Sequence, residues 1–258
     1  AYLSAKKLLT EKLQLQAGLR YEHTWTESNQ LTQRQINRSH YGRFYPTLHL
    51  NWQLKDNQNL ALAANWGIER PNFNDLNPFR IYTSTTDYMT GNPYLTAAYT
   101  RNVEINYSNG KGLYAVLYNN HGKGEIGWRT QFLENGSQIT GPYDGLRHEK
   151  TGIYANYNRN VLTWLNLNIG GEIYYYDSHS DYQTNVLQIH GWGKRAEGSL
   201  SFMLNHQKTL IGEVSYHHWF QEYFAQTQSD SYAYLRMSLK YSCLDDRLKI
   251  SLTIGDPF

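Results

Sequence analysis

The sequence has almost no cysteine and no long apolar run, and both shortages narrow the classes of protein that it can encode. Cys243 is the single cysteine among 258 residues, so an intrachain disulfide and a cysteine metal cluster are excluded. No segment approaches the roughly 18 to 20 consecutive apolar residues that a transmembrane helix requires. The formal net charge is only +2 and no basic block occurs, which argues against nucleic acid as a partner.

The sequence also lacks the short motifs that mark common catalytic and metal sites. It contains no G-x-S-x-G elbow, no H-E-x-x-H pair and no phosphate-binding glycine loop. Glu213 and His217 share a face of one predicted strand, but a polar network inside the protein explains them better than a metal does. Asp177 and His179 on a predicted loop are the one acid–base pair that is left as a candidate for catalysis. We therefore expect no enzyme activity, no metal site and no cofactor.

Aromatic residues, by contrast, are abundant in a chain that is hydrophilic on average. Tyrosine occurs 23 times and tryptophan 7 times, while the mean hydropathy is −0.68. A transmembrane β-barrel has this composition, because each strand turns one apolar face to lipid and one polar face to the lumen. The polar lumen residues then cancel the lipid-facing ones in the average.

Apolar and polar residues alternate in runs of about ten residues, which is the period of a half-buried strand. The clearest runs are 13–25, 48–54, 60–69, 165–173, 233–241 and 248–254. The run 113–132 is the least regular, and we expect a bulge at 122–127. The pattern predicts an all-β protein, an antiparallel up-and-down transmembrane β-barrel with about 11 to 12 strands of a larger barrel, counting a partial strand at 2–9.

The predicted connections alternate in length along the chain. Short polar links lie near 55–58, 109–112, 158–163, 205–208 and 242–247. A long link precedes each of them. The long links lie near 27–41, 69–97, 133–147, 177–191 and 221–230. A membrane barrel has tight turns on its periplasmic side and long loops outside, so this alternation favours a membrane barrel over a soluble sandwich.

Tryptophan and tyrosine gather at the predicted strand ends. Trp52, Tyr107, Tyr157, Trp164 and Tyr241 lie beside short links, whereas Trp25, Trp66 and Tyr175 lie beside long ones. Aromatic belts of this kind mark both interfaces of a membrane. The alternative is that these residues simply favour strands. Together with the loop lengths, two belts indicate the cell outer membrane, with its lipid as a partner.

One stretch carries a more specific signal. It reads R-P-N-F-N-D-L-N-P-F and then G-N-P-Y-L, and its motif positions are Arg70, Pro71, Leu76, Pro78, Phe79, Gly91, Asn92, Pro93 and Leu95. This stretch resembles the TonB-dependent receptors, in particular the outer-membrane β-barrel family of Bacteroidetes-type bacteria. That family usually continues with K-P-E, where this chain has Thr96, Ala97 and Ala98.

The resemblance implies the barrel portion of an outer-membrane transporter that imports a nutrient: an iron chelate, a vitamin, a glycan or a peptide. Such a receptor has a barrel of about twenty-two strands, a plug domain in the same full-length protein, and an N-terminal segment that contacts TonB. Residues 1–258 would then form a partial barrel domain without the plug and the terminal strands. No signal peptide is visible near Ala1, which fits this expectation. Counted along the alternating turns, strand 248–254 should run outward, whereas the last strand of an outer-membrane protein should return to the periplasm.

Two groups of residues are candidates for function. Arg70, Asn72, Asp75, Tyr82 and Tyr94 are candidates for substrate contact on the loop, although turn-forming residues and prolines at the barrel rim favour a purely architectural role. The predicted lumen-facing residues pair with one another or with the plug; they are Arg20, Glu22, Glu69, Glu104, Glu172, Glu213 and Arg236.

Two other functions stay open on the sequence. The first is a stand-alone structural or adhesive outer-membrane barrel of about twelve strands. The second, less favoured, is a soluble β protein that binds glycans through aromatic residues in its loops. The flanking sequence would separate the first from a transporter, and monodispersity without detergent would identify the second.

Overall fold

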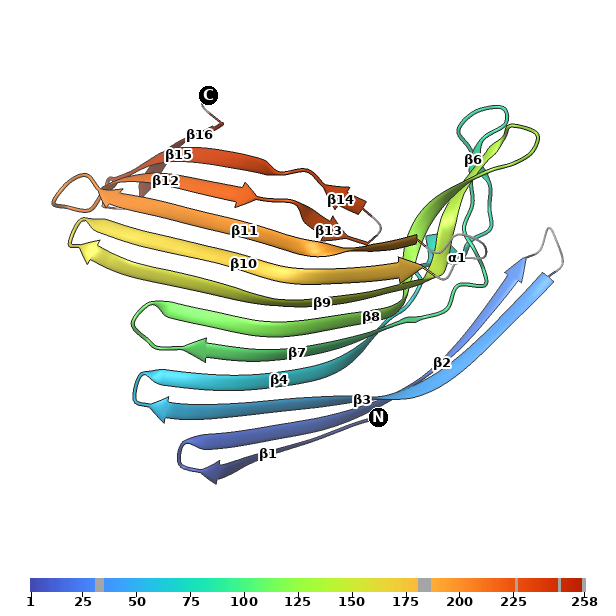
Figure 1. Cartoon of the computed structure of the whole chain (residues 1–258), viewed down its shortest axis with the longest axis horizontal. Coiled ribbons are helices and arrows are strands. Elements are labelled where there is room, and N and C mark those ends of the chain that lie inside the picture. The colour runs from blue at the N-terminus through green and yellow to red at the C-terminus, as the bar shows by residue number, and fades with distance from the viewer. Residues whose placement is uncertain (31–34, 181–186, 226, 246, 257–258) are drawn as a thin grey trace.

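The computed structural model describes residues 1–30, 35–180, 187–225, 227–245 and 247–256. Twelve strands follow one another in a single curved antiparallel sheet (Figure 1). In order across the sheet they are β1 (Tyr2–Thr10), β2 (Leu13–Gln30), β3 (Gln35–Lys55), β4 (Gln58–Glu69), β7 (Ala98–Ser108), β8 (Leu113–Phe132), β9 (Gln138–Leu162), β10 (Leu165–Ser180), β11 (Leu187–Met203), β12 (Leu210–Trp219), β15 (Tyr232–Cys243) and β16 (Leu248–Gly255).

Each strand pairs with its neighbours in the chain, so the up-and-down order expected from the sequence is confirmed. The partial strand expected at 2–9 is β1, which pairs with β2. Within the described residues, β1 and β16 each have one strand partner and do not pair with each other, so the sheet stays open. The described part of the chain contains no helix long and apolar enough to cross a membrane.

The short links form tight turns at one end of the strands. At Asn109 the side-chain oxygen accepts hydrogen bonds from the backbone N–H groups of Lys111 (2.8 Å) and Leu113 (3.0 Å), which closes the β7–β8 turn. Gly112 has φ +108° there, and a Cβ at this position would lie 1.9 Å from the carbonyl oxygen of Asn158. Only glycine fits this approach of one turn to the neighbouring strand.

Three of the long links are shorter than predicted, because the strands continue into them. β2 and β3 remain paired as far as Gln30 and Gln35, and β8 and β9 as far as Phe132 and Gln138. β10 and β11 likewise pair up to Ser180. Beyond a membrane both faces of a hairpin meet water, so the apolar alternation ends while the backbone ladder continues. The prediction of loops throughout 27–41, 133–147 and 177–191 was therefore wrong, and its central parts at 31–34 and 181–186 lie outside the described residues.

The other two long links hold small elements. The link after β4 contains α1 (Phe73–Leu76), β5 (Ile81–Tyr82) and β6 (Tyr88–Met89), and the link after β12 contains the hairpin of β13 (Glu222–Phe224) and β14 (Thr227–Ser229). The predicted bulge in β8 is confirmed, since the β8–β9 register shifts on both sides of Glu125.

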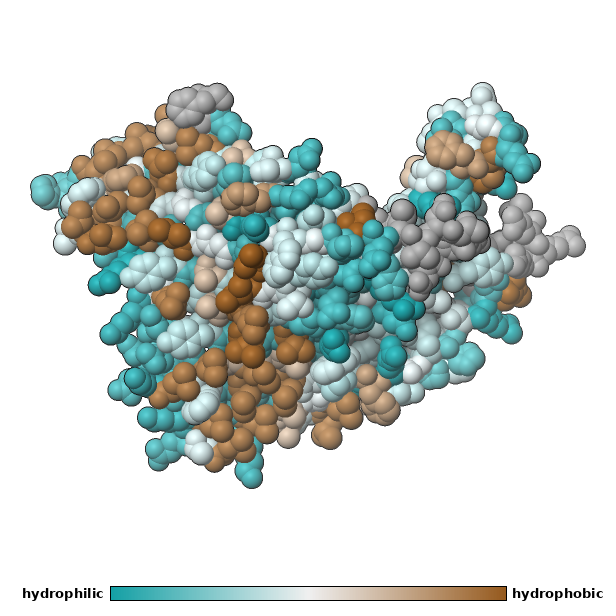
Figure 2. Space-filling view, viewed as in Figure 1, coloured by the Kyte–Doolittle hydropathy of each residue, from teal (hydrophilic) through white to brown (hydrophobic). Residues whose placement is uncertain are grey.

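The two faces of the sheet differ as the alternation predicts. Along β10, Ile169, Ile173 and Tyr175 are exposed, whereas Tyr174 and Tyr176 on the opposite face are only 2% and 4% exposed. Figure 2 shows hydrophobic side chains gathered in two patches, one at the turn end of β12–β16 and one in the region of β1–β4, with a largely hydrophilic surface toward the other end of the sheet. We call the end of the sheet opposite the tight turns the upper end. Trp25 lies 74% exposed near the upper end of β2, as expected of a belt residue.

Tyrosine and glycine pack together across strands on the buried face. A Cβ on Gly193 would lie 2.0 Å from the ring of Tyr174, and one on Gly152 would lie 2.6 Å from the Cβ of the same tyrosine. The ring therefore covers the backbone at Gly193 in β11, while the Cβ of the same tyrosine lies against Gly152 in β9. This packing gives one structural reason for the large numbers of both residue types.

Candidate functional site

The loop after β4 is built around α1, the one helix among the described residues. Asn72 caps α1: its Oδ1 accepts from the backbone N–H of Asp75 (2.9 Å), and Oδ2 of Asp75 accepts from the backbone N–H of Asn72 (3.2 Å). This reciprocal pair is a capping box, which fixes both side chains in the turn. Two of the predicted substrate-contact residues therefore have a structural role in the loop.

The G-N-P part of the motif packs against the end of this helix. Gly91 donates its backbone N–H to the carbonyl of Asn77 (2.9 Å), and Asn92 donates to the carbonyl of Asp75 (2.6 Å). A Cβ on Gly91 would lie 2.4 to 2.7 Å from the carbonyl oxygens of Asn74, Asp75 and Asn77. The two halves of the motif are thus in contact, and glycine is required where they meet.

The loop is attached to the upper part of the β8–β9 hairpin. β6 adds to β9 as a parallel strand, with Tyr88 opposite Ile139. Oδ2 of Asp144 accepts from the backbone N–H of Thr96 (2.9 Å) and from its hydroxyl (2.5 Å). Loop and hairpin therefore form one apical unit above the sheet (Figure 1).

Asp87 makes a further link within this apical unit. Its Oδ1 accepts a hydrogen bond from the backbone N–H of Gln138 (2.9 Å), and its Oδ2 accepts one from the hydroxyl of Ser84 (2.9 Å). The bond from Gln138, followed by the bond from Ser84, lowers the pKa of Asp87 below its ordinary value. The attachment of loop to hairpin is therefore strongest when this carboxyl group is ionised.

A groove of 1230 Å³ lies between the apical loop and the upper part of the β2–β3 hairpin. Its lining is mainly apolar and aromatic on the loop side, and it carries three arginines and one glutamate. The lining residues are Trp25, Thr26, Glu27, Ile36, Asn37, Arg38, Ser39, Tyr41, Arg70, Pro71, Phe73, Leu76, Asn77, Pro78, Phe79, Arg80, Pro93, Tyr94, Leu95, Thr96 and Ala97.

The groove brings together two of the five predicted substrate-contact residues. Arg70 and Tyr94 line it, and the Tyr94 residue is 65% exposed. Asn72 and Asp75 are not in the lining. Tyr82 lies elsewhere on the apical unit, 60% exposed, with its ring 5.5 Å from that of Tyr88.

Arg70 is held by the upper end of β2 rather than left open to a ligand. Its guanidinium forms an ion pair with Glu22 and donates to the hydroxyl of Thr24 at 3.0 and 3.2 Å. Glu22 also pairs with Arg20 at 2.9 Å. These contacts join the R-P motif to the lumen-facing side of β2, so they fix where the loop leaves the sheet.

The buried face of β8–β12 carries a connected network of charged and aromatic side chains. Glu172 is its centre, with its side chain 11% exposed. It pairs with Lys150 (3.0 Å) and Arg195 (3.6 Å) and accepts a hydrogen bond from the hydroxyl of Tyr118. Lys150 also lies 3.8 Å from the ring centre of Tyr174, in cation–π contact.

The network continues across the next two strands. Glu197 accepts a hydrogen bond from the hydroxyl of Tyr154 (2.9 Å), and its other oxygen lies 3.6 Å from Nδ1 of His217. His217 is therefore a member of a polar network, as predicted, and the described residues contain no group of three metal-ligating side chains. The sequence interpretation missed Lys150, Tyr154 and Glu197, although their parity along the strands places them on this face.

The remaining predicted lumen residues are more loosely placed. Glu213 pairs with Lys240 at 3.7 Å, and the guanidinium of Arg236 lies 5.3 Å from the ring centre of Tyr234. Glu69 and Glu104 have no ion pair within the described part of the chain. The charged residues of this face thus form one tight network and several separate contacts.

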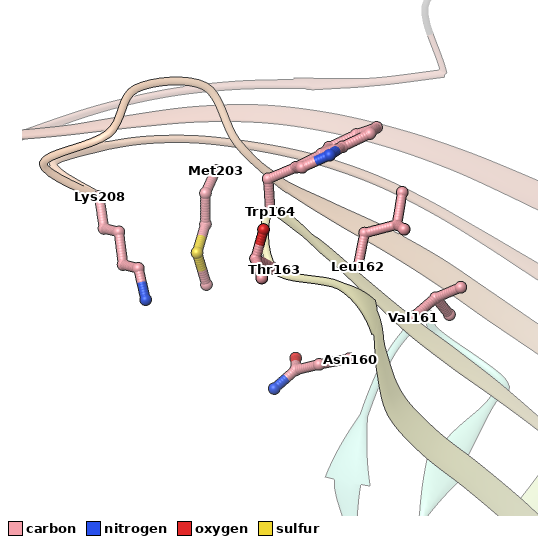
Figure 3. Close-up of a pocket in the computed structure, with 7 residues that line it drawn as sticks. All are labelled: Asn160, Val161, Leu162, Thr163, Trp164, Met203 and Lys208. Atoms are coloured by element: carbon pink, nitrogen blue, oxygen red, sulfur yellow. The ribbon is translucent and has the colours of Figure 1, made fainter.

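A second pocket, of 650 Å³, lies at the turn end of β9–β12 and is lined by Asn160, Val161, Leu162, Thr163, Trp164, Met203 and Lys208. Figure 3 shows Val161, Leu162 and Trp164 pointing to one side, while Met203 and Lys208 point to the other. An exposed tryptophan beside a lysine is typical of a membrane interface. We interpret this pocket as part of the lower aromatic belt rather than as a ligand site.

Comparison with known proteins identifies this architecture. The whole chain, residues 1–258, matches the model of the outer membrane protein beta-barrel family. The chain belongs to this family. Membership places it in the cell outer membrane, with the apolar face of the sheet toward lipid and the polar face toward the lumen. A search of curated protein sequences gives no match.

Several solved structures share the fold of this outer-membrane barrel chain. They include the siderophore receptor PirA from Pseudomonas aeruginosa (16% identity, TM-score 0.70), the FrpB iron transporter from Neisseria meningitidis (12%, 0.65) and the copper transporter OprC (10%, 0.73). They cover 98–100% of this chain, which in turn spans only 44%, 40% and 41% of theirs. The predicted fold class and outer-membrane location are therefore confirmed.

Proposed function

We propose that the chain is the barrel portion of a TonB-dependent transporter that imports a nutrient across the outer membrane. The observation that carries the proposal is the apical unit, in which the R-P and G-N-P halves of the receptor-like motif pack together at the rim of the sheet. Receptors and transporters among the structural neighbours support it. Residues 1–258 then form a partial barrel domain, and β1 and β16 pair with strands outside this chain.

The lumen face supports a second part of the proposal. The network around Glu172 combines both charges with tyrosine hydroxyl groups on a face that is turned away from lipid. A plug domain of the same full-length protein would dock on such a surface through complementary polar groups. Glu69 and Glu104, which lack ion pairs in the described residues, are the candidates for direct contact with the plug.

Substrate would first meet the protein at the groove beside the apical loop. Tyr94 is its most exposed candidate for stacking on a ligand, and Arg70 positions the loop through Glu22 and Thr24. Asn72 and Asp75 support the same loop from within α1. The proposal therefore assigns substrate contact to Tyr94 in the groove and to the exposed Tyr82 elsewhere on the apical unit, and positioning to Arg70, Asn72 and Asp75.

Growth of a bacterium that carries the gene tests the proposal. A deletion strain should lose growth on one sole source among iron chelates, vitamins, glycans and peptides, and the full-length gene should restore it. A full-length gene without the TonB-contacting segment should not restore growth, although the protein reaches the outer membrane. Equal growth of all strains on every source would contradict transport and favour a structural or adhesive barrel.

A further inference from the structure

β3 has a long edge that no strand covers. It runs from Gln35 to Lys55, yet its pairing with β4 ends at Thr47 opposite Asn65. Its pairing with β2 continues without a break to Gln35. The barrel wall is therefore split above this point, and the upper β2–β3 hairpin diverges from β4 in Figure 1.

Pro46 explains why the ladder stops there. The backbone N–H of Gln53 donates a hydrogen bond to the carbonyl oxygen of Lys12, the residue just before β2, at 2.8 Å. In an antiparallel ladder successive residues point their backbone groups to alternate sides, so odd-numbered residues of β3 bond β2 and even-numbered ones face β4. The next even position above the last β3–β4 pairs is Pro46, which has no N–H to donate.

Above Pro46 the same alternation leaves a row of free backbone groups. Ile36, Arg38, His40, Gly42 and Phe44 direct their N–H and C=O groups away from β2, and no described strand pairs with them. Such an edge is a template for another strand. Nine residues of β3, from 36 to 44, give an edge of about 30 Å at roughly 3.3 Å per residue.

The groove lies along the upper part of this edge, at residues 36–39 and 41, and its far wall cannot close it by strand pairing. That wall contains three prolines, Pro71, Pro78 and Pro93, which lack the N–H groups that a ladder needs. Phe73 and Phe79 on the same wall are 78% and 70% exposed. The groove therefore combines free backbone groups on one side with exposed apolar side chains on the other.

The charge of the groove is unbalanced. Of its three arginines, Arg38 pairs with Glu27 at 2.9 Å and Arg70 pairs with Glu22. Arg80 contacts Tyr82 and Tyr88 but has no carboxylate partner among the described residues. One cation is thus available to a ligand carboxylate.

We propose that this groove binds an extended peptide, which adds to β3 as a strand and places a carboxylate at Arg80. The inference rests on the proposed function and names the class of its substrate. Strand addition uses main-chain hydrogen bonds for affinity and needs no single side-chain sequence. Continuity with the β3–β4 ladder below Pro46 sets the spacing of these bonds.

Backbone methylation of a probe peptide tests this geometry without changing the protein. The probe is a fluorescent nonapeptide of alternating Ile and Ser with a free C-terminus, added to outer-membrane vesicles that contain the full-length protein. Two methylated probes are compared, one N-methylated at its odd-numbered residues and one at its even-numbered residues; we call these the two frames. Only one frame removes the N–H donors that face β3, and the other leaves those donors intact. One frame should weaken binding at least tenfold, since several hydrogen bonds are lost together, and the other should not.

A matched pair of variants tests the protein side. His40→Pro removes an N–H of the free β3 edge, between Ser39 and Tyr41 of the groove lining, and leaves the β2–β3 ladder intact, whereas His40→Val removes the same side chain and keeps the N–H. The proline variant should bind the probe at least fivefold more weakly than the valine variant, at equal levels in the membrane. Equal losses in both frames, equal binding by the two variants, or no binding at all would overturn the proposal.

Uptake separates this inference from the proposed function. Probe binding that depends on the methylation frame, without TonB-dependent uptake of any nutrient, would leave the peptide site standing and remove transport. Uptake of another nutrient without probe binding would do the reverse. Hydrogen-exchange protection of the amides of Ile36, Arg38, His40, Gly42 and Phe44 in the ligand-free protein would show that another segment already covers the edge, and would also overturn the peptide site.

Discussion

Nζ of Lys150 lies 3.0 Å from Oε1 of Glu172 and 3.8 Å from the ring centre of Tyr174, so a single cation joins an acidic and an aromatic partner in the lumen. Arg195 approaches the same carboxylate from the other side. The two cations share one largely covered anion, which makes Glu172 the residue on which the network depends.

Glu172→Gln should destabilise the full-length protein by about 1–3 kcal/mol. The substitution keeps the shape of the side chain but leaves Lys150 and Arg195 without their anion in a partly covered site. Urea unfolding in detergent, followed by tryptophan fluorescence, measures the effect. Glu69→Gln is the control on the same face and should change stability by less than about 0.5 kcal/mol. Equal effects of the two variants would show that the network is not a stabilising unit.

Gly91→Ala should loosen the apical loop. The new methyl group would lie within 2.7 Å of three carbonyl oxygens at the end of α1, and backbone atoms cannot move aside as a flexible side chain can. We expect a cost of about 1–3 kcal/mol, localised to residues 70–97. Limited trypsin digestion of outer-membrane vesicles should cleave after Arg80 faster than in the wild type. Gly198→Ala, where the nearest atom is 3.8 Å away, is the matched control and should not change the cleavage rate.

The attachment of the loop to β9 should weaken in acid through Asp87. Its pKa is lower in the folded protein than in the unfolded chain, because Gln138 and Ser84 donate hydrogen bonds to it. The stabilisation is therefore fully present above the unfolded pKa, about 4, and is lost as the pH falls through the folded value. Hydrogen exchange of the Gln138 amide, corrected for intrinsic rates, should accelerate below that pH. Asp87→Asn should abolish the pH dependence, and an unchanged profile would exclude this mechanism.

The alternation of residues was sufficient to predict the strands that cross the membrane, because lipid on one side and lumen on the other impose a period of two. Ile169 and Ile173 on one face and Glu172 on the other follow that rule. Above the membrane the rule fails, since both faces meet water. The extensions of β2, β3, β9, β10 and β11 were therefore predicted as loops.

The candidate site was only partly predictable for a different reason. The motif indicated where the apical loop begins and ends, but the partner of Arg70 is Glu22, 48 residues away, and only the packing of β2 against the loop brings them together. Pro46 was a signal that the sequence interpretation missed. A proline inside a predicted strand of a continuous sheet marks an edge, and here it marks the point where the wall splits.

Expressed alone, residues 1–258 should not form a closed monomer. β1 and β16 each have an edge with no strand partner in the described residues, and unpaired backbone groups cannot face lipid. The chain folded into detergent should therefore aggregate or pair edge to edge, and it should show no shift in mobility between unheated and boiled samples on a gel. The full-length protein is the control and should show that shift. A sharp, reversible unfolding transition of the isolated chain as a monomer would mean that β1 and β16 close on each other, and would favour a stand-alone barrel of about twelve strands.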